Sequence, residues 1–167
     1  MNKACALIAI AAAFAVTAAG EVRSQQQSPP ANADDTAAAP YILTMGDMMN
    51  TLIQPRHVKL GLAGRAGNWP LAAYALVEIR QAFAGIKKAQ PKFHGLPVPE
   101  LVDAALGPPL DAVEAAIRQQ DPKQFAAAYN RLTQGCNACH QSVDHPFVVI
   151  KAPDASVFPD QDFNPGH

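Results

Sequence analysis

Residues 121–143 read DPKQFAAAYNRLTQGCNACHQSV, and this stretch sets the expectation for the fold. Asp121 is a typical helix N-cap, and Pro122 is favoured at the first helical position. Gln124 adds a capping-box-like pattern, so the spacing predicts a helix that begins here. Apolar side chains then recur at steps of four and three, at Phe125, Tyr129, Leu132, Cys136, Cys139 and Val143. This period predicts an amphipathic helix with both cysteines on its buried face, ending at Pro146.

Five residues of this helix, Cys136-Asn137-Ala138-Cys139-His140, have the spacing C-x-x-C-H. That spacing is the attachment signature of c-type haem. Each thiol can form a thioether with a haem vinyl group. His140 follows Cys136 by four residues, so it lies on nearly the same helix face and can ligate the iron. The sequence therefore predicts one covalently attached haem c, with its iron, held by Cys136, Cys139 and His140.

Two other interpretations of these residues are weaker. Cys136, Cys139 and His140 supply three ligands, whereas a structural zinc site uses four. A thioredoxin-like dithiol lies near a βαβ pattern, and we find no such pattern in this sequence.

The N-terminal residues indicate export. Lys3 is followed by an apolar run from Ala4 to Val16 and by small residues at 18–20, which is typical of a secretory signal peptide over residues 1–20. The run is too short for a membrane-spanning helix, which needs about 20 residues. Removal of Cys5 with the signal leaves only the two motif cysteines, and a free dithiol is hard to maintain in an oxidising compartment. We therefore expect a periplasmic protein whose mature chain has no membrane span.

The rest of the chain predicts an all-α protein. Residues 21–40 are rich in polar and small side chains and read as a flexible leader. Helical periodicity follows in three stretches before residue 121, which we place at 41–64, at 69–88, and from about 102 to 117 after the loop 91–99. Pro55 should bend the first of these stretches, and Gly107-Pro108-Pro109 should kink the third or break it into two short helices.

Four amphipathic helices with short connections predict an antiparallel four-helix bundle over residues 41–145. Residues 146–167 have no helical period, and we expect them to pack as an extended tail over the bundle or the haem edge. The net charge of −1 favours neither nucleic acid nor an anionic membrane surface as a partner.

With an exported chain, four helices and CNACH on the last of them, the sequence resembles the class II c-type cytochromes, which include cytochrome c′. The resemblance covers about residues 41–145 and implies thioethers at Cys136 and Cys139 and a proximal ligand at His140. It also implies one of two distal arrangements: a first-helix Met ligand for electron transfer, or an open face that binds gas. Relatives of cytochrome c′ often pair through the first helix, so a homodimer is one arrangement open to this chain. The 27 residues after His140 are a departure from the family pattern.

The sixth iron ligand is the main open question. In an antiparallel bundle, His140 is level with the first turns of the first helix, where Met45, Met48 and Met49 lie. Met45 and Met49 share the inward stripe, whereas Met48 is about 100° round from Met49. We expect Met49 to be the ligand, ahead of Met45, although Met is also a common core side chain.

His57 and Arg56 are the other candidates near the haem. His57 is eight residues beyond Met49, about 12 Å along the helix axis, which is too far for ligation unless Pro55 resets the helix. We expect it instead to be a partly buried histidine bonded to backbone or to a haem propionate. Arg56 could pair with a propionate through its fork of donors, or lie on a solvated helix face. Trp69 is expected to be a packing anchor, and His94, His145 and His167 to be surface residues.

The leading hypothesis is a periplasmic electron-transfer cytochrome with one haem and His/Met-ligated iron, whose partners are redox proteins. The alternative is a five-coordinate haem protein that binds NO or CO in an apolar pocket. We expect no enzymatic activity. A peroxidase needs a distal acid or base beside the iron, and the one candidate, His57, is expected to lie too far away.

Overall fold

The computed structural model describes residues 41–166, and this part of the chain is mainly helical. The all-α prediction is therefore confirmed. The predicted signal peptide (1–20), the predicted leader (21–40) and His167 lie outside the described residues. The elements are α1 Met45–Met48, the π-helix η1 Met49–Ile53, α2 Gln54–Arg65, α3 Trp69–Ala89, β1 Lys92–Phe93, β2 Leu96–Pro97, α4 Val98–Gln119 and α5 Pro122–Ser142.

The first helical stretch is continuous from α1 through η1 into α2. Thr44 caps its start, because the Thr44 side chain accepts from the Asp47 N–H while the Asp47 carboxylate accepts from the Thr44 N–H. The π-helical segment ends two residues before Pro55, and the bend expected at Pro55 stays a prediction. A proline ring clashes with the carbonyl four residues earlier, here Thr51, and the wider π-turn accommodates that clash.

The third stretch differs from its prediction. Pro108 and Pro109 both lie inside a single helix, so the expected break into two short helices is wrong. Buried Leu106 and Leu110 lie on either side of the two prolines, and their packing holds the helix together. The predicted loop 91–99 contains the two-stranded hairpin β1–β2, which leads directly into α4.

The helix that carries CNACH begins as predicted. The Asp121 side chain accepts hydrogen bonds from the N–H groups of Lys123 and Gln124. The helix ends at Ser142, four residues before Pro146, so His140 lies in its last turn.

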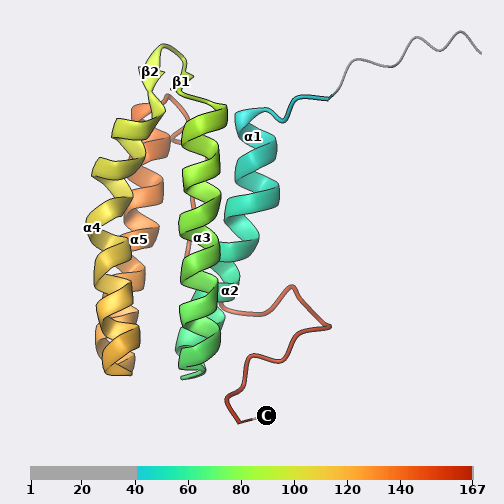
Figure 1. Cartoon of the computed structure of the whole chain (residues 1–167), viewed down its shortest axis with the longest axis vertical. Coiled ribbons are helices and arrows are strands. Elements are labelled where there is room, and N and C mark those ends of the chain that lie inside the picture. Colours follow the sequence, from blue (N-terminus) through green and yellow to red (C-terminus); the bar gives the residue numbers. More distant parts are fainter. Residues whose placement is uncertain (1–40, 167) are drawn as a thin grey trace, which may run out of the picture. The chain divides into compact units, whose positions relative to one another are not determined.

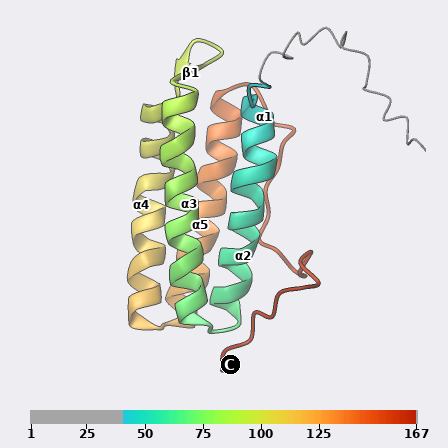
Figure 2. The ribbon, with the colours of Figure 1, turned by 45° about the vertical axis from the view of Figure 1, so that its right-hand side comes forward.

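The helices lie side by side (Figures 1 and 2), with α4 packed on α5 and on α3, and α2 packed on α3 and on α5. The predicted apolar stripes are buried along α2, α3 and α4, and the largest fully enclosed side chains are Leu60, Ile79, Ile86, Leu132 and Val113. Trp69 is a packing residue, since it is partly buried against the core and its ring packs edge-to-face on that of Phe125, with 6.1 Å between the ring centroids.

Two close approaches draw α5 against its neighbours. Gly64 of α2 lies where a side chain would collide with the ring of Phe125, so the ring occupies the space that the glycine leaves. Gly135 lies against the backbone carbonyl group of Ala105 in α4. That carbonyl lacks an intrahelical donor because residue 109 is proline, and Gly135 lets the α5 backbone cover it.

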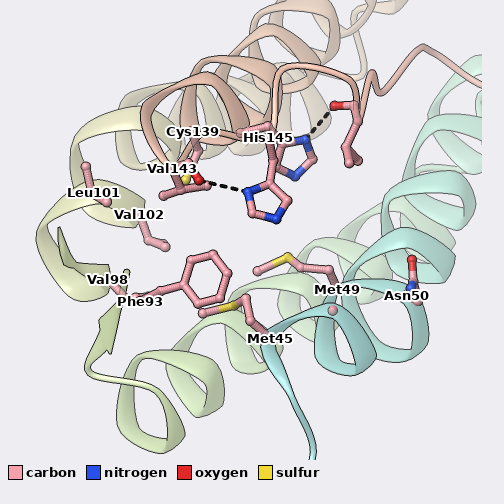
Figure 3. A pocket seen from close by; sticks show the side chains of 13 residues that line it. Met45, Met49, Asn50, Phe93, Val98, Leu101, Val102, Cys139, Val143 and His145 are labelled. Carbon is pink, nitrogen blue, oxygen red and sulfur yellow. Dashed lines mark hydrogen bonds between the residues drawn. The ribbon is translucent and has the colours of Figure 1, made fainter. Parts of the chain in front are cut away.

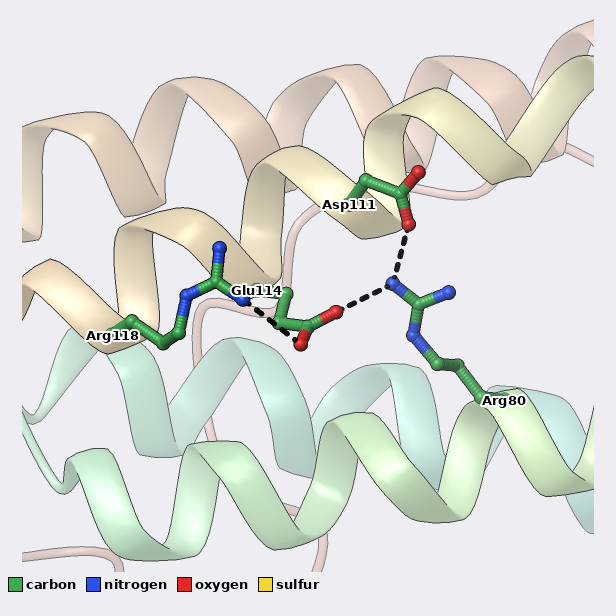
Figure 4. Close-up of polar contacts among 4 residues, drawn as sticks. All are labelled: Arg80, Asp111, Glu114 and Arg118. Atoms are coloured by element: carbon green, nitrogen blue, oxygen red, sulfur yellow. Dashed lines mark hydrogen bonds and ion pairs between the residues drawn. The ribbon is translucent and has the colours of Figure 1, made fainter.

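A surface ion-pair network joins α3 to α4 (Figure 4). Arg80 lies 2.8 Å from Asp111 and 3.1 Å from Glu114, and Arg118 lies 3.2 Å from the other oxygen of Glu114. All four side chains are at least a third exposed, so the network contributes little to stability.

The tail after α5 is irregular and runs along the helices. Arg65 donates to the carbonyl group of Pro153, and Asn68 donates to that of Asn164 at 3.1 Å. The Lys59 ammonium group lies 4.6 Å from the centre of the Phe158 ring. The tail is therefore tied to the far end of α2.

Candidate haem site

Two adjoining cavities, of about 180 and 230 Å³, lie where the C-terminal end of α5 faces α1 and η1. They share the lining residues Met49, Asn50, Val102, Cys139, His140 and Val148. Figure 3 shows the first cavity with Met45, Met49 and Phe93 on one side and Cys139, Val143 and His145 on the other. The structure thus brings the C-x-x-C-H motif and two of the predicted methionines to one space.

The two motif cysteines both face the second cavity and are free thiols. Cys136 is 8% exposed, and Cys139 is half-buried. Burial, with a smaller contribution from Cys139, raises the pKa of Cys136 to about 12. Burial also raises the pKa of Cys139. Both sulfurs are therefore neutral at pH 7.

His140 lines both cavities and is held by the tail. Its Nδ1 donates a hydrogen bond to the backbone carbonyl group of Val148 at 2.8 Å. Since a carbonyl only accepts, Nδ1 carries a proton, so in the neutral ring it is Nε2 that has the free lone pair. A histidine in this state is ready to ligate a metal through Nε2.

Met45 and Met49 face inward as predicted, but Met48, which its helical position placed off the inward stripe, is the most buried of the three methionines. Met45 and Met49 line the cavities, whereas Met48 is 3% exposed and lies in the core. Met49 borders both cavities and Met45 only the first. Met49 also begins the π-helical segment, and such segments often occur at functional sites.

His57 is a buried structural residue, 2% exposed, at the edge of the second cavity. Its Nε2 lies 3.0 Å from the Thr133 hydroxyl and its Nδ1 lies 3.0 Å from the Tyr129 hydroxyl. Tyr129 donates to the His57 carbonyl oxygen at 2.7 Å and stacks on the ring. Burial lowers the pKa of His57 to about 4, so the ring is neutral. Both ring nitrogens are thus already engaged within the protein.

Arg56 is not brought to the cavities. Its guanidinium group donates to the Leu52 carbonyl oxygen at 2.8 Å and pairs with Glu78 of α3 at 3.4 Å. Of these two contacts, the pair with Glu78 joins α2 to α3, and the bond to Leu52 lies within the first helical stretch.

Several lining residues come from segments that carry no periodic signal. The hairpin supplies Phe93, the start of α4 supplies Val98, and the tail supplies Val148, Val149 and Ile150. His145, expected on the surface, is half-buried and its ring lies 5.7 Å from both Phe93 and His94. The position of a loop residue depends on tertiary contacts, which is why only the helix residues could be predicted.

The residues present fit a c-type haem. Two thiols and an imidazole project from one helix into a mainly apolar space, and a thioether faces them from another helix. The two cavities together reach the lower part of the range of ligand pockets, about 300–1,000 Å³. No lysine or arginine lines either cavity, so these linings supply no cationic partner for the propionates.

Within residues 41–166, no helix is both long and apolar enough to cross a membrane. In the same range, no three or more His, Cys, Asp or Glu side chains form a group that could hold a bare metal ion. Comparison of the chain with models of protein families, with curated proteins and with solved structures finds no match.

Proposed function

We propose that the chain is an exported monohaem c-type cytochrome that transfers electrons in the periplasm. The observation that carries this proposal is the convergence of Cys136, Cys139, His140 and Met49 on the same pair of cavities. The protein carries one haem c on Cys136 and Cys139, with His140 as the proximal iron ligand and Met49 as the sixth.

The proposed architecture is an antiparallel four-helix bundle of the class II cytochrome type. Short connections support it: residues 66–68 join α2 to α3, the hairpin joins α3 to α4, and residues 120–121 join α4 to α5. Connections of this length place consecutive helices as antiparallel neighbours.

When bound, the haem supplies a one-electron iron couple whose potential is raised by His/Met ligation. The remaining tasks belong to the protein. Cys136 and Cys139 hold the group covalently, and the Nδ1–H bond of His140 keeps Nε2 available. The buried apolar side chains of α4 keep water from one side of the group, and redox partner proteins exchange the electron.

The apolar lining favours one second candidate, a five-coordinate haem that binds NO or CO. A neutral diatomic molecule enters an apolar space without losing hydrogen bonds, whereas an anion pays a large desolvation cost. In this candidate Met49 is a wall residue and not a ligand.

The test is to express the chain in a bacterium that attaches haem c and to ask whether haem stays with the polypeptide on a denaturing gel. The wild-type protein is expected to retain it, and the C136A/C139A variant to lose it. The matched control is C5A, since Cys5 lies in the predicted signal peptide and should leave attachment intact. A mature protein without haem would overturn the proposal.

Absorption spectra of the holoprotein separate the two candidates. Low-spin iron in both oxidation states, unchanged when CO is added to the reduced protein, is expected of the electron carrier. High-spin iron that binds CO supports the gas-binding candidate.

A further inference from the structure

The first residue between the two cysteines makes an unusual contact. The side-chain Nδ2 of Asn137 donates to the Ile150 carbonyl oxygen at 2.9 Å, and the Ile150 N–H donates to Oδ1 of Asn137 at 2.7 Å. The amide thus pairs with the tail as a neighbouring β-strand would. Both atoms of the side chain are used, and both bonds are partly buried.

The segment between His140 and this pair is folded back on itself. The His145 N–H donates to the His140 carbonyl oxygen at 2.8 Å, and the Val148 N–H donates to the His145 carbonyl oxygen at 3.0 Å. Two successive turns therefore lead the chain from the end of α5 to Val148. The Val148 carbonyl group then accepts from Nδ1 of His140.

Apolar burial contributes little to holding this segment. Phe147 is 77% exposed and Val149 is 73% exposed, whereas only Ile150 packs against the core. The next tie further along the tail is from Arg65 to Pro153. The Val148 carbonyl group orients His140. Apart from the segment's own backbone hydrogen bonds, the two Asn137–Ile150 bonds are the attachment closest to it along the chain.

We propose that Asn137 is a positioning residue for the proximal ligand: by clamping Ile150 it fixes the Val148 carbonyl group, which in turn orients the His140 ring and selects its Nδ1–H tautomer. The inference rests on the proposed function, because it takes His140 as the iron ligand. A hydrogen bond from the outer nitrogen of a ligating histidine makes the imidazole a stronger electron donor to the iron. A stronger donor stabilises the oxidised iron, so the intact clamp keeps the midpoint potential lower than it would otherwise be.

Two measurements on N137A test this. In the first, trypsin cleavage after Lys151, an exposed site in the tail next to the clamp, is followed by mass spectrometry. Loss of both bonds should speed this cleavage about fivefold or more. In the second, the midpoint potential of the holoprotein should move to a more positive value. N137Q keeps both polar groups on a longer side chain and should fall between N137A and the wild type.

The matched control is Q134A, which removes an exposed side-chain amide from the same helix. It should change neither the cleavage rate nor the potential. Helical circular dichroism establishes that each variant is folded.

The outcomes separate the possible failures. Faster cleavage with an unchanged potential shows that Asn137 ties down the tail without positioning His140, which overturns the inference. Unchanged cleavage and potential overturn it as well. A protein that never acquires haem refutes the proposed function. Trypsin cleavage can be measured on the chain without haem, so it still tests whether the two Asn137–Ile150 hydrogen bonds hold the tail.

Discussion

Gly135, the residue before the first cysteine of the motif, lies directly against the backbone carbonyl group of Ala105 in α4. A methyl group at this position would meet a backbone oxygen, which cannot move aside as a flexible side chain can. The distance between α4 and α5 beside the candidate haem site is therefore set by the absence of a side chain here.

We predict that G135A lowers the free energy of unfolding by about 1–2 kcal/mol. Overpacking costs about 1–3 kcal/mol, and the better helix propensity of alanine offsets up to about 1 kcal/mol of this. The control is G85A in α3, where nothing lies within 4 Å of the added methyl group. It should stabilise the protein by about 0.5–1 kcal/mol. Urea denaturation measures both, and equal effects of the two changes would contradict the prediction.

Met49 and Met45 can be separated by matched substitutions. In the holoprotein, M49L should lower the midpoint potential and abolish the long-wavelength absorption band of thioether-ligated ferric haem, because leucine cannot ligate iron. M45L should change neither, since leucine fills a similar volume. If M45L gives the larger change, the ligand is Met45. If neither variant changes the spectrum, the His/Met proposal fails.

His57 should make stability depend on pH. Its pKa is about 4 in the folded protein because of burial, against an ordinary value of about 6.5. Between these values the unfolded chain binds a proton that the folded chain does not. The free energy of unfolding therefore falls as the pH is lowered from 6.5 to 4, by up to about 3 kcal/mol, and is unaffected by this group above that range.

Urea denaturation at a series of pH values measures this effect. H57Q should flatten the dependence between pH 4 and 6.5, whereas H94Q, at an exposed histidine, should retain it. A slope in H57Q equal to that of the wild type would show that other groups are responsible.

The ion-pair network between α3 and α4 should contribute only weakly. E114Q removes the partner shared by Arg80 and Arg118 and should cost about 0.5 kcal/mol at low salt. This loss of unfolding free energy should be smaller at 1 M salt, where the screening length is about 3 Å. D154N, which removes an isolated and more exposed pair with Lys151, is the comparison and should cost less. A larger cost for D154N would contradict this account.

Most of the helical structure could be predicted because its signals are local. The Asp121 cap, the apolar stripe of α3 and the steps of three and four along α5 all depend on neighbours within one or two turns. The same local rule placed Met45 and Met49 on an inward face, where they line the cavities, but it did not predict that Met48 lies in the core.

The errors arose where tertiary contacts override a local preference. Pro108 and Pro109 predicted a kink or a break, and the break is wrong because the apolar residues on either side of them are buried and keep α4 whole. No local pattern predicts that Arg56 pairs with Glu78, 22 residues away, and the propionate contact of Arg56 stays a prediction. The bonds of Asn137 to the tail likewise join segments that no periodic pattern relates.

The π-helical segment before Pro55 has a consequence for the length of the chain. A π-turn holds one residue more than the α-helical turn it replaces, so deleting one residue from 50–53 would leave a helix that can still make its hydrogen bonds. Because the α-turn that remains covers the same rotation, the side chains before and after the deletion keep their faces. Met45 and Met49 would still face the cavity, and His57 and Leu60 would stay in place. The same deletion from the α-helical residues 58–61 would instead rotate everything before it by about 100° relative to the rest of α2. The stretch just before Pro55 is therefore a place where the chain can lose one residue without moving the side chains that line the cavity.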